Sequence, residues 1–148
     1  MTEQVATGAF CLRYWQPTDQ VEIGCQVTGV PEVVAHADRA ARVYRAQGAD
    51  CLAGVSLWRG ADSPENSLSL AIGPPCWAIV HTDAEFFQTV TRGPRSPERT
   101  PQKVRFDDLL EIPSDCFIDR ALAIDTVSLW MTEDALLQAA GFSDDLFG

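Results

Sequence analysis

The chain has 148 residues, of which 46% are hydrophobic, and it carries a formal net charge of −10 with a pI near 4.4. This length and composition predict one globular domain over 1–148, and the acidic charge argues against nucleic-acid binding, which needs a positive surface. No apolar run reaches the roughly 18 residues of a membrane span, and the start MTEQVATGAF lacks the features of a secretory signal, so we expect a cytoplasmic protein without a membrane partner.

A hairpin and a helix are the first elements predicted along the chain. Apolar and polar residues alternate at 10–15 and 21–27, which predicts two strands around a turn. A helix is predicted from Pro31, which suits a first turn, to Gly48, which suits the position after a last turn. We expect the apolar side of this helix to pack against the sheet.

The segment 51–91 is the centre of the predicted fold. It contains the runs CLAGVSLW, SLSLAI, CWAIVHT and FFQTVT, separated by a polar break, by GPP and by a short polar stretch. The two-residue period predicts strands, and short connections favour antiparallel neighbours over helical crossovers. We therefore expect an antiparallel meander here, with 86–91 as its last strand.

The remaining third is predicted to hold a loop, an edge strand and helices. The proline-rich, basic segment 92–103 predicts an exposed loop, and the alternation at 103–106 predicts a short edge strand. A second helix is expected between Ser114 and Met131. Thr132 resembles the N-cap of a short last helix that Gly141 would close.

These elements predict an α+β fold. We expect an antiparallel sheet of five or six strands, with two main helices packed on one face and a short C-terminal helix. The acidic tail at 142–148 is expected to fray, as chain ends often do.

Patterns of catalysis and of cofactor binding do not occur in the sequence. There is no GxSxG elbow and no glycine-rich nucleotide loop. The five cysteines are widely spaced without a CxxC pair, so we expect small core residues instead of a metal or redox site. His81 and Asp83 could supply two metal ligands, but nothing completes the shell. We therefore predict no cofactor, no metal and no enzymatic activity.

The negative charge is concentrated toward the C-terminus. Residues 107–148 contain ten acidic side chains and one basic side chain, Arg120, whereas 1–106 are almost balanced. One interpretation is a solvated surface that aids solubility, and the other is a binding surface for a basic partner. Trp58 and Trp130 are candidate exposed anchors for such a surface, with packing in the core as the alternative.

The order of patterns resembles that of a known family. Between 28 and 131, a strand and a helix precede LSLAIGPPCWAIVH, KVRFDDLLEIP and a helix near IDRALAIDTV. In these features the chain resembles small immunity proteins of bacterial polymorphic toxin systems, a family often paired with deaminase-type toxins in actinobacteria. The resemblance implies a non-enzymatic, cytoplasmic antidote that binds a cognate toxin domain and blocks its active site.

The predicted partner is therefore a cognate toxin domain, with no nucleic acid or membrane bound directly, and the free chain is expected to be a monomer or weak dimer. The predicted partner-binding residues are seven carboxylates and one tryptophan of the C-terminal third: Asp107, Asp108, Glu111, Asp115, Asp119, Trp130, Glu133 and Asp134. One alternative is a small ligand-binding protein or enzyme with a pocket near Cys76, Trp77 and His81. Another is an adaptor for some other basic protein.

Overall fold

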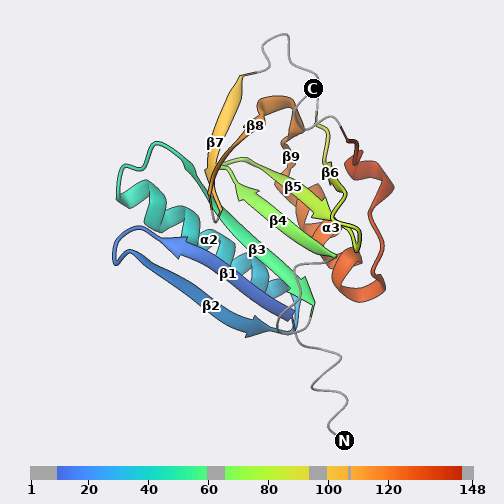
Figure 1. Ribbon diagram of the computed structural model, residues 1–148, viewed down its shortest axis with the longest axis horizontal. Helices are drawn as coiled ribbons and strands as arrows, with labels where there is room; N and C mark the ends of the chain where they lie inside the picture. Colours follow the sequence, from blue (N-terminus) through green and yellow to red (C-terminus); the bar gives the residue numbers. More distant parts are fainter. Residues whose placement is uncertain (1–9, 60–65, 94–99, 107, 145–148) are drawn as a thin grey trace, which may run out of the picture.

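A computed structural model describes residues 10–59, 66–93, 100–106 and 108–144 (Figure 1). These residues form an α+β fold of one sheet and two helices, as the sequence predicts. The strands are β1 (Phe10–Gln16), β2 (Val21–Val27), β3 (Leu52–Arg59), β4 (Ser67–Ile72), β5 (Cys76–Thr82), β6 (Gln88–Val90), β7 (Pro101–Arg105), β8 (Leu109–Pro113) and β9 (Ile118–Asp119). The helices are α2 (Val30–Ala46) and α3 (Arg120–Glu133), with 3-10 turns at η1 (Ser114–Cys116) and η2 (Gln138–Ala140).

The main path of the sheet runs in the order β2-β1-β3-β4-β5-β6, and each strand on it is antiparallel to its neighbours (Figure 1). Beyond the point where β1 leaves β3, β7 pairs in parallel with β3 at Leu52 and Ala53, and β8 pairs with β7. The short β9 pairs with the start of β5, whereas β6 pairs with its end. The chain thus adds its late strands to both margins of an early antiparallel sheet.

This sheet of nine strands is larger than the five or six predicted. The edge strand expected at 103–106 is β7, but β8 and β9 were not predicted at all. β8 spans LLEIP and β9 has two residues, so neither shows a useful period. Their hydrogen bonds come from partners that the topology brings near, which local periodicity does not show.

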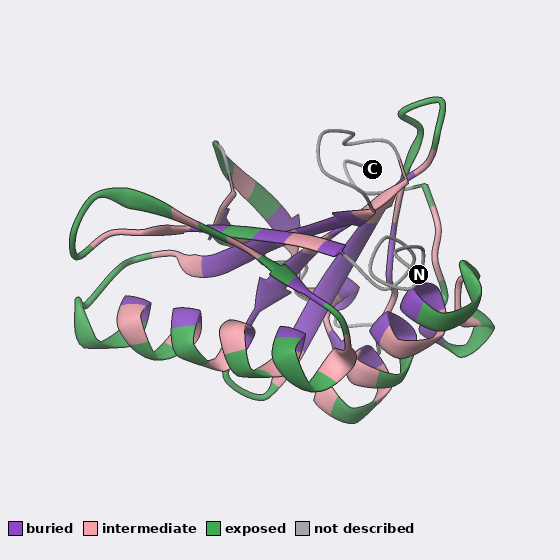
Figure 2. Ribbon diagram, turned by 90° about the horizontal axis from the view of Figure 1, so that it is seen from below, coloured by how far each residue is buried: buried purple, intermediate pink, exposed green. Residues whose placement is uncertain are grey.

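Both helices pack on the same face of the sheet (Figure 2). The α2 helix has Pro31 in its first turn and is followed by Gly48 at φ 66°, as predicted. Side chains of both helices enclose the main core against alternate residues of β1, β3, β4 and β5. Arg120 at the start of α3 holds both carboxylate oxygens of Asp38 in α2, at 2.6 and 3.0 Å, and joins the helices.

The β7–β8 hairpin covers part of the opposite face. Ala78 and Val80 of β5 pack there against Val104 and Ile112 in a second, smaller core. The hairpin approaches closely at Gly54, where an added Cβ would lie 2.4 Å from the Phe106 ring. A side chain at this position of β3 would therefore displace the hairpin from the sheet.

The segment after α3 differs from its prediction. Thr132 lies in the last turn of α3 and does not cap a new helix, and η2 replaces the predicted short helix. Gly141 ends η2 at φ 69°. Phe142 packs on the core and Ser143 pairs with Val90, so this part of the expected tail is docked. Residues 145–148 lie outside the described part of the chain.

No disulfide joins the five cysteines, all of which lie in the described ranges. Cys116 is buried as predicted, whereas Cys11, Cys25, Cys51 and Cys76 are half-buried. Within the described ranges, no three histidine, cysteine or carboxylate side chains come together as a metal site. Neither helix of these ranges has the length and apolar character that crossing a membrane requires.

Candidate functional site

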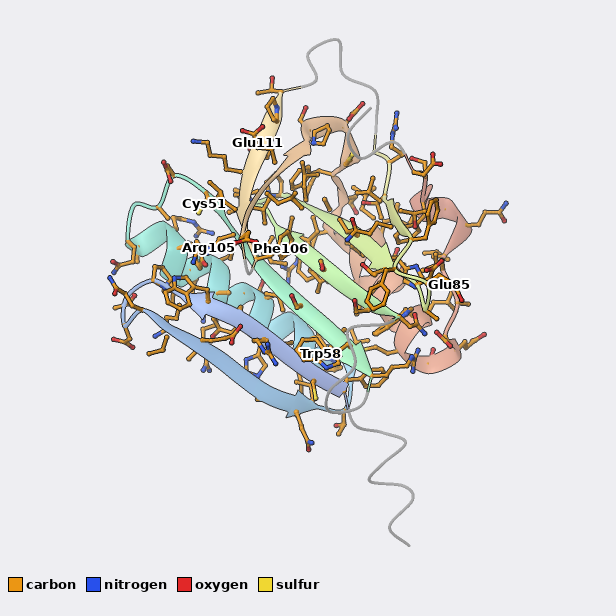
Figure 3. All side chains as sticks on the ribbon, viewed as in Figure 1. Cys51, Trp58, Glu85, Arg105, Phe106 and Glu111 are labelled. Carbon is orange, nitrogen blue, oxygen red and sulfur yellow. The ribbon has the colours of Figure 1, made fainter. Side chains whose placement is uncertain are left out.

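The structure separates the predicted acidic surface into two ends of the sheet. Asp108 and Glu111 lie at the β7–β8 hairpin, which joins the start of β3, whereas Asp134 pairs with Arg59 at the end of β3. The eight residues of β3 span about 23 Å at about 3.3 Å per residue. Figure 3 shows Glu111 on the β7–β8 hairpin and Glu85 well apart from it, on the side of the β5–β6 turn. The predicted carboxylates therefore fall into separate groups along the sheet, and Asp107 lies outside the described residues.

Other predicted site residues have structural roles. Trp130 is 1% exposed and Trp58 is 9% exposed, so neither is a surface anchor. Asp115 is also buried, where its carboxylate lies 3.8 Å from the Arg92 guanidinium. Asp119 is exposed, but its side chain accepts a hydrogen bond from the Ala121 N–H and caps α3. Burial thus removes Trp130 and Asp115 from any exposed binding surface.

The predicted pocket near Cys76, Trp77 and His81 is not formed by these three residues together. Successive residues of a strand point to opposite faces, and Trp77 is buried in the main core under the helices. Cys76 instead lines a cavity of about 200 Å³ on the other face, near Pro74. A second cavity of about 150 Å³ also reaches Pro74. Pro74 lies in the β4–β5 turn, at the far end of β5 from His81.

A polar network joins the other end of the sheet to α3. The side-chain oxygen of Asn66 accepts hydrogen bonds from Trp130 Nε1 at 3.1 Å and from His81 Nε2 at 2.9 Å. The amide nitrogen of Asn66 donates to Asp134 at 2.8 Å. Arg59 pairs with Asp134 at 3.4 Å, donates to the Trp130 carbonyl and stacks over the Trp130 ring. The ends of β3, β5 and α3 are thereby fixed around Asn66.

Burial within this network disfavours the charged form of His81. Burial lowers the pKa of His81, although the nearby carboxylates of Asp83 and Asp134 act to raise it. Because Asn66 Oδ1 can only accept, His81 Nε2 must carry the proton in the 2.9 Å contact. A second proton would place a charge in a poorly solvated position.

This pKa shift predicts a pH dependence of stability. The unfolded chain has a His81 pKa near its ordinary value of about 6.5, above that of the folded chain, so acidification protonates the unfolded state first. The contribution of neutral His81 to the free energy of unfolding is complete above about pH 6.5. It is lost as the pH falls below that value toward the folded-state pKa. Denaturant titrations at several pH values should show a smaller acid loss in His81→Gln than in wild type. Equal losses in both proteins would contradict this origin.

The turn after His81 exposes two phenylalanines. The Asp83 carboxylate accepts hydrogen bonds from the N–H groups of Glu85 and Phe87, each at 2.9 Å, and so fixes a tight turn between β5 and β6. Phe86 is 59% exposed and Phe87 is 55% exposed. The strand predicted at 86–91 is therefore shorter, because β6 begins only at Gln88.

Phe86 also has an unfavourable backbone conformation. Its φ of 64° lies in the left-handed region, which costs about 1–2 kcal/mol for a residue with a side chain. Asn66 and Asp134, both at φ 53°, adopt this region at the same end, but their short polar side chains tolerate it. The exposed Phe86 ring gains little packing to offset the strain. The conformation is part of the turn itself, in which the Phe86 N–H donates to the Asp83 carbonyl at 2.9 Å.

We define the acidic-aromatic surface as the exposed turn together with the end of α3. The His81–Asn66–Asp134 contacts bring these two segments to one end of the sheet, and Figure 3 shows Glu85 beside the end of α3. The buried Trp130 side chain donates a hydrogen bond to Asn66 and so helps to hold the end of α3 in place. The members are Asp83, Glu85, Phe86, Phe87, Glu133 and Asp134.

Only Glu133 and Asp134 of this surface were predicted from the sequence. The two phenylalanines were missed because FFQTVT has strong strand propensity. A signal was nevertheless present in Asp83, since an aspartate after a strand often closes a turn through its own side chain.

Comparisons with protein-family models, with curated proteins and with solved structures found no match. The resemblance to immunity proteins thus rests on the sequence patterns alone.

Proposed function

We propose that this chain is a non-enzymatic inhibitor that binds a basic toxin domain, in the manner of an immunity protein, and acts in the cytoplasm. The observation that carries the proposal is the pair of exposed phenylalanines in a strained turn bordered by carboxylates. Aromatic side chains dominate the binding energy of many protein interfaces. Exposed phenylalanines next to carboxylates are well suited to that use.

The charges around Phe86 and Phe87 favour a basic partner. Asp83, Glu85 and Asp134 lie around the turn or at the helix end, so a positive surface would be attracted to this end. A toxin that acts on nucleic acid needs a basic cleft for the phosphates. An inhibitor can then combine apolar contact from the rings with charge complementarity from their border.

The other exposed carboxylates have a different role in this proposal. Asp108 and Glu111 lie at the β7–β8 hairpin, which pairs with the start of β3, and are not part of the proposed contact. They add to the negative field that guides a basic partner during encounter. Their removal should therefore change the association rate more than the dissociation rate.

Affinity capture from a native lysate, followed by a growth assay, tests this function. Tagged wild type should retain one basic domain in a one-to-one complex, and a Phe86→Ala, Phe87→Ala double variant should lose it. Leu109→Ala is the matched control, because Leu109 is 54% exposed at the other end of the sheet. Expression of the captured domain alone should stop growth, and coexpression of wild type should restore it.

Two results would contradict the proposal. One is a captured domain that binds the double phenylalanine variant as tightly as wild type. The other is a captured domain whose effect on growth does not respond to coexpression of this chain. Complex formation should also weaken as salt is raised, because charges contribute to it.

A further inference from the structure

Within the described ranges, the outer edge of β2 has no partner strand, no bulge, no proline and no lysine. β2 is the outermost strand (Figure 1) and pairs with β1 along all seven residues, from Val21 to Val27, without a bulge. Its sequence VEIGCQV contains neither proline nor lysine. The N–H and C=O groups on its outer side therefore form a template for another strand.

The other margins of the sheet are better protected. β6 has only three residues, and its Val90 pairs with Ser143. β8 has five residues and ends at Pro113, which cannot donate a backbone hydrogen bond. Among the described edge strands, β2 is therefore the one most open to pairing with a further strand.

We propose that β2 pairs with β2 of a second copy of this chain, antiparallel about a two-fold axis at Gly24. The axis is perpendicular to the sheet, so side chains that face each other must point to the same side. This restricts the pairing to registers centred on a residue. Only the register centred on Gly24 overlaps the full strand, with Val21 opposite Val27 of the second copy.

The side chains fit this register. Glu22 lies opposite Gln26 of the second copy, so a carboxylate meets an amide that can donate to it. Ile23 lies opposite Cys25 of the second copy, on the side where β2 is apolar. Val21 on that side is 42% exposed in the single chain. A register centred on Glu22 would instead oppose the two carboxylates, which disfavours it.

The second copy binds at the opposite margin of the sheet from β6, so pairing leaves the acidic-aromatic surface free. Two chains with a net charge of −10 repel each other, and salt should relieve that repulsion. Dimerisation is therefore expected to strengthen with salt, whereas binding of a basic partner weakens. This opposite response distinguishes the two interactions.

Sedimentation equilibrium of the full chain over a concentration series tests the proposal. Gln26→Lys places a cation opposite Glu22 in two symmetric pairs and should tighten dimerisation about fivefold, whereas Gln26→Glu should weaken it about fivefold. Gln47→Lys and Gln47→Glu are matched controls at an exposed position beyond α2. Both should dimerise as wild type does, apart from the small effect of the changed net charge. A wild type that stays monomeric, or a dimer that ignores residue 26, would overturn the proposal.

A thiol cross-link tests the axis itself. A Cβ at Gly24 would have its nearest neighbour at 3.9 Å, so cysteine fits there. Directly opposed residues of antiparallel strands have Cα atoms about 4.5–5.5 Å apart, within disulfide range. Mild oxidation should give far more covalent dimer with Gly24→Cys than with wild type or with Asp19→Cys in the β1–β2 turn. Equal yields from the two cysteine variants would reject the axis at Gly24.

Discussion

Replacement of Trp130 by alanine is expected to lower the free energy of unfolding by about 3–5 kcal/mol. The ring is 1% exposed, lies 5.7 Å from the Phe10 ring and is covered by the Arg59 guanidinium. Truncation would leave a cavity between α3 and the sheet and would remove the N–H donor to Asn66. Denaturant unfolding followed by circular dichroism measures the loss without depending on tryptophan fluorescence.

Two further variants separate the contributions of Trp130. Trp130→Phe keeps most of the buried volume but leaves the Asn66 oxygen with one donor fewer, so we expect a loss of about 1–2 kcal/mol. Leu129→Ala, at a half-buried neighbour in α3, should cost less than Trp130→Ala. A Trp130→Ala protein as stable as the Leu129 variant would show that Trp130 is not a core residue.

Replacement of Phe86 by glycine is expected to separate folding from binding. Glycine adopts the φ of 64° without strain, so the free energy of unfolding should stay near that of wild type or rise by up to about 1 kcal/mol. Binding of the basic partner should nevertheless weaken, because an aromatic contact is lost. Together with Phe87→Ala, we expect a loss of about 2–4 kcal/mol in binding, or about 30-fold to 1,000-fold in Kd.

Calorimetric titration of the captured toxin domain gives the binding part of this comparison. Leu109→Gly provides a matched loss of an exposed apolar side chain at the other end of the sheet, and it should leave the affinity unchanged. If Phe86→Gly binds as wild type does, the exposed ring is not part of the interface. If it unfolds more readily, the strain at Phe86 is offset by packing within the free chain.

The early part of the fold could be predicted because its signals are local. The β1–β2 hairpin, α2 and the strands β3 to β5 each combine a clear hydrophobic period with turn residues at their ends. β8 and β9 could not be found in this way, because β8 depends on β7 and β9 on the start of β5. Their pairing depends on the topology, and the five residues of β8 and the two residues of β9 carry no local pattern that shows it.

Burial of polar and aromatic residues was the hardest feature to predict. Asp115 is buried where Arg92, which is distant in sequence, lies beside it, and no local pattern shows that proximity. Trp130 falls on the apolar side of α3 with Ala123 and Val127, at helical spacing, but its acidic neighbours also suggested exposure. The acidic-aromatic surface differs from the predicted partner-binding residues for the same reason. Phe86 and Phe87 are exposed and lie in a turn, whereas their apolar character predicted a strand.

Amide hydrogen exchange of this chain, free and bound to the captured toxin domain, tests the central claim most directly. If the acidic-aromatic surface is the binding site, exchange should slow at 83–88 and 130–135 in the complex, and stay unchanged at the β7–β8 hairpin. Protection of the hairpin around Glu111, with the Phe86 turn unchanged, would contradict the account.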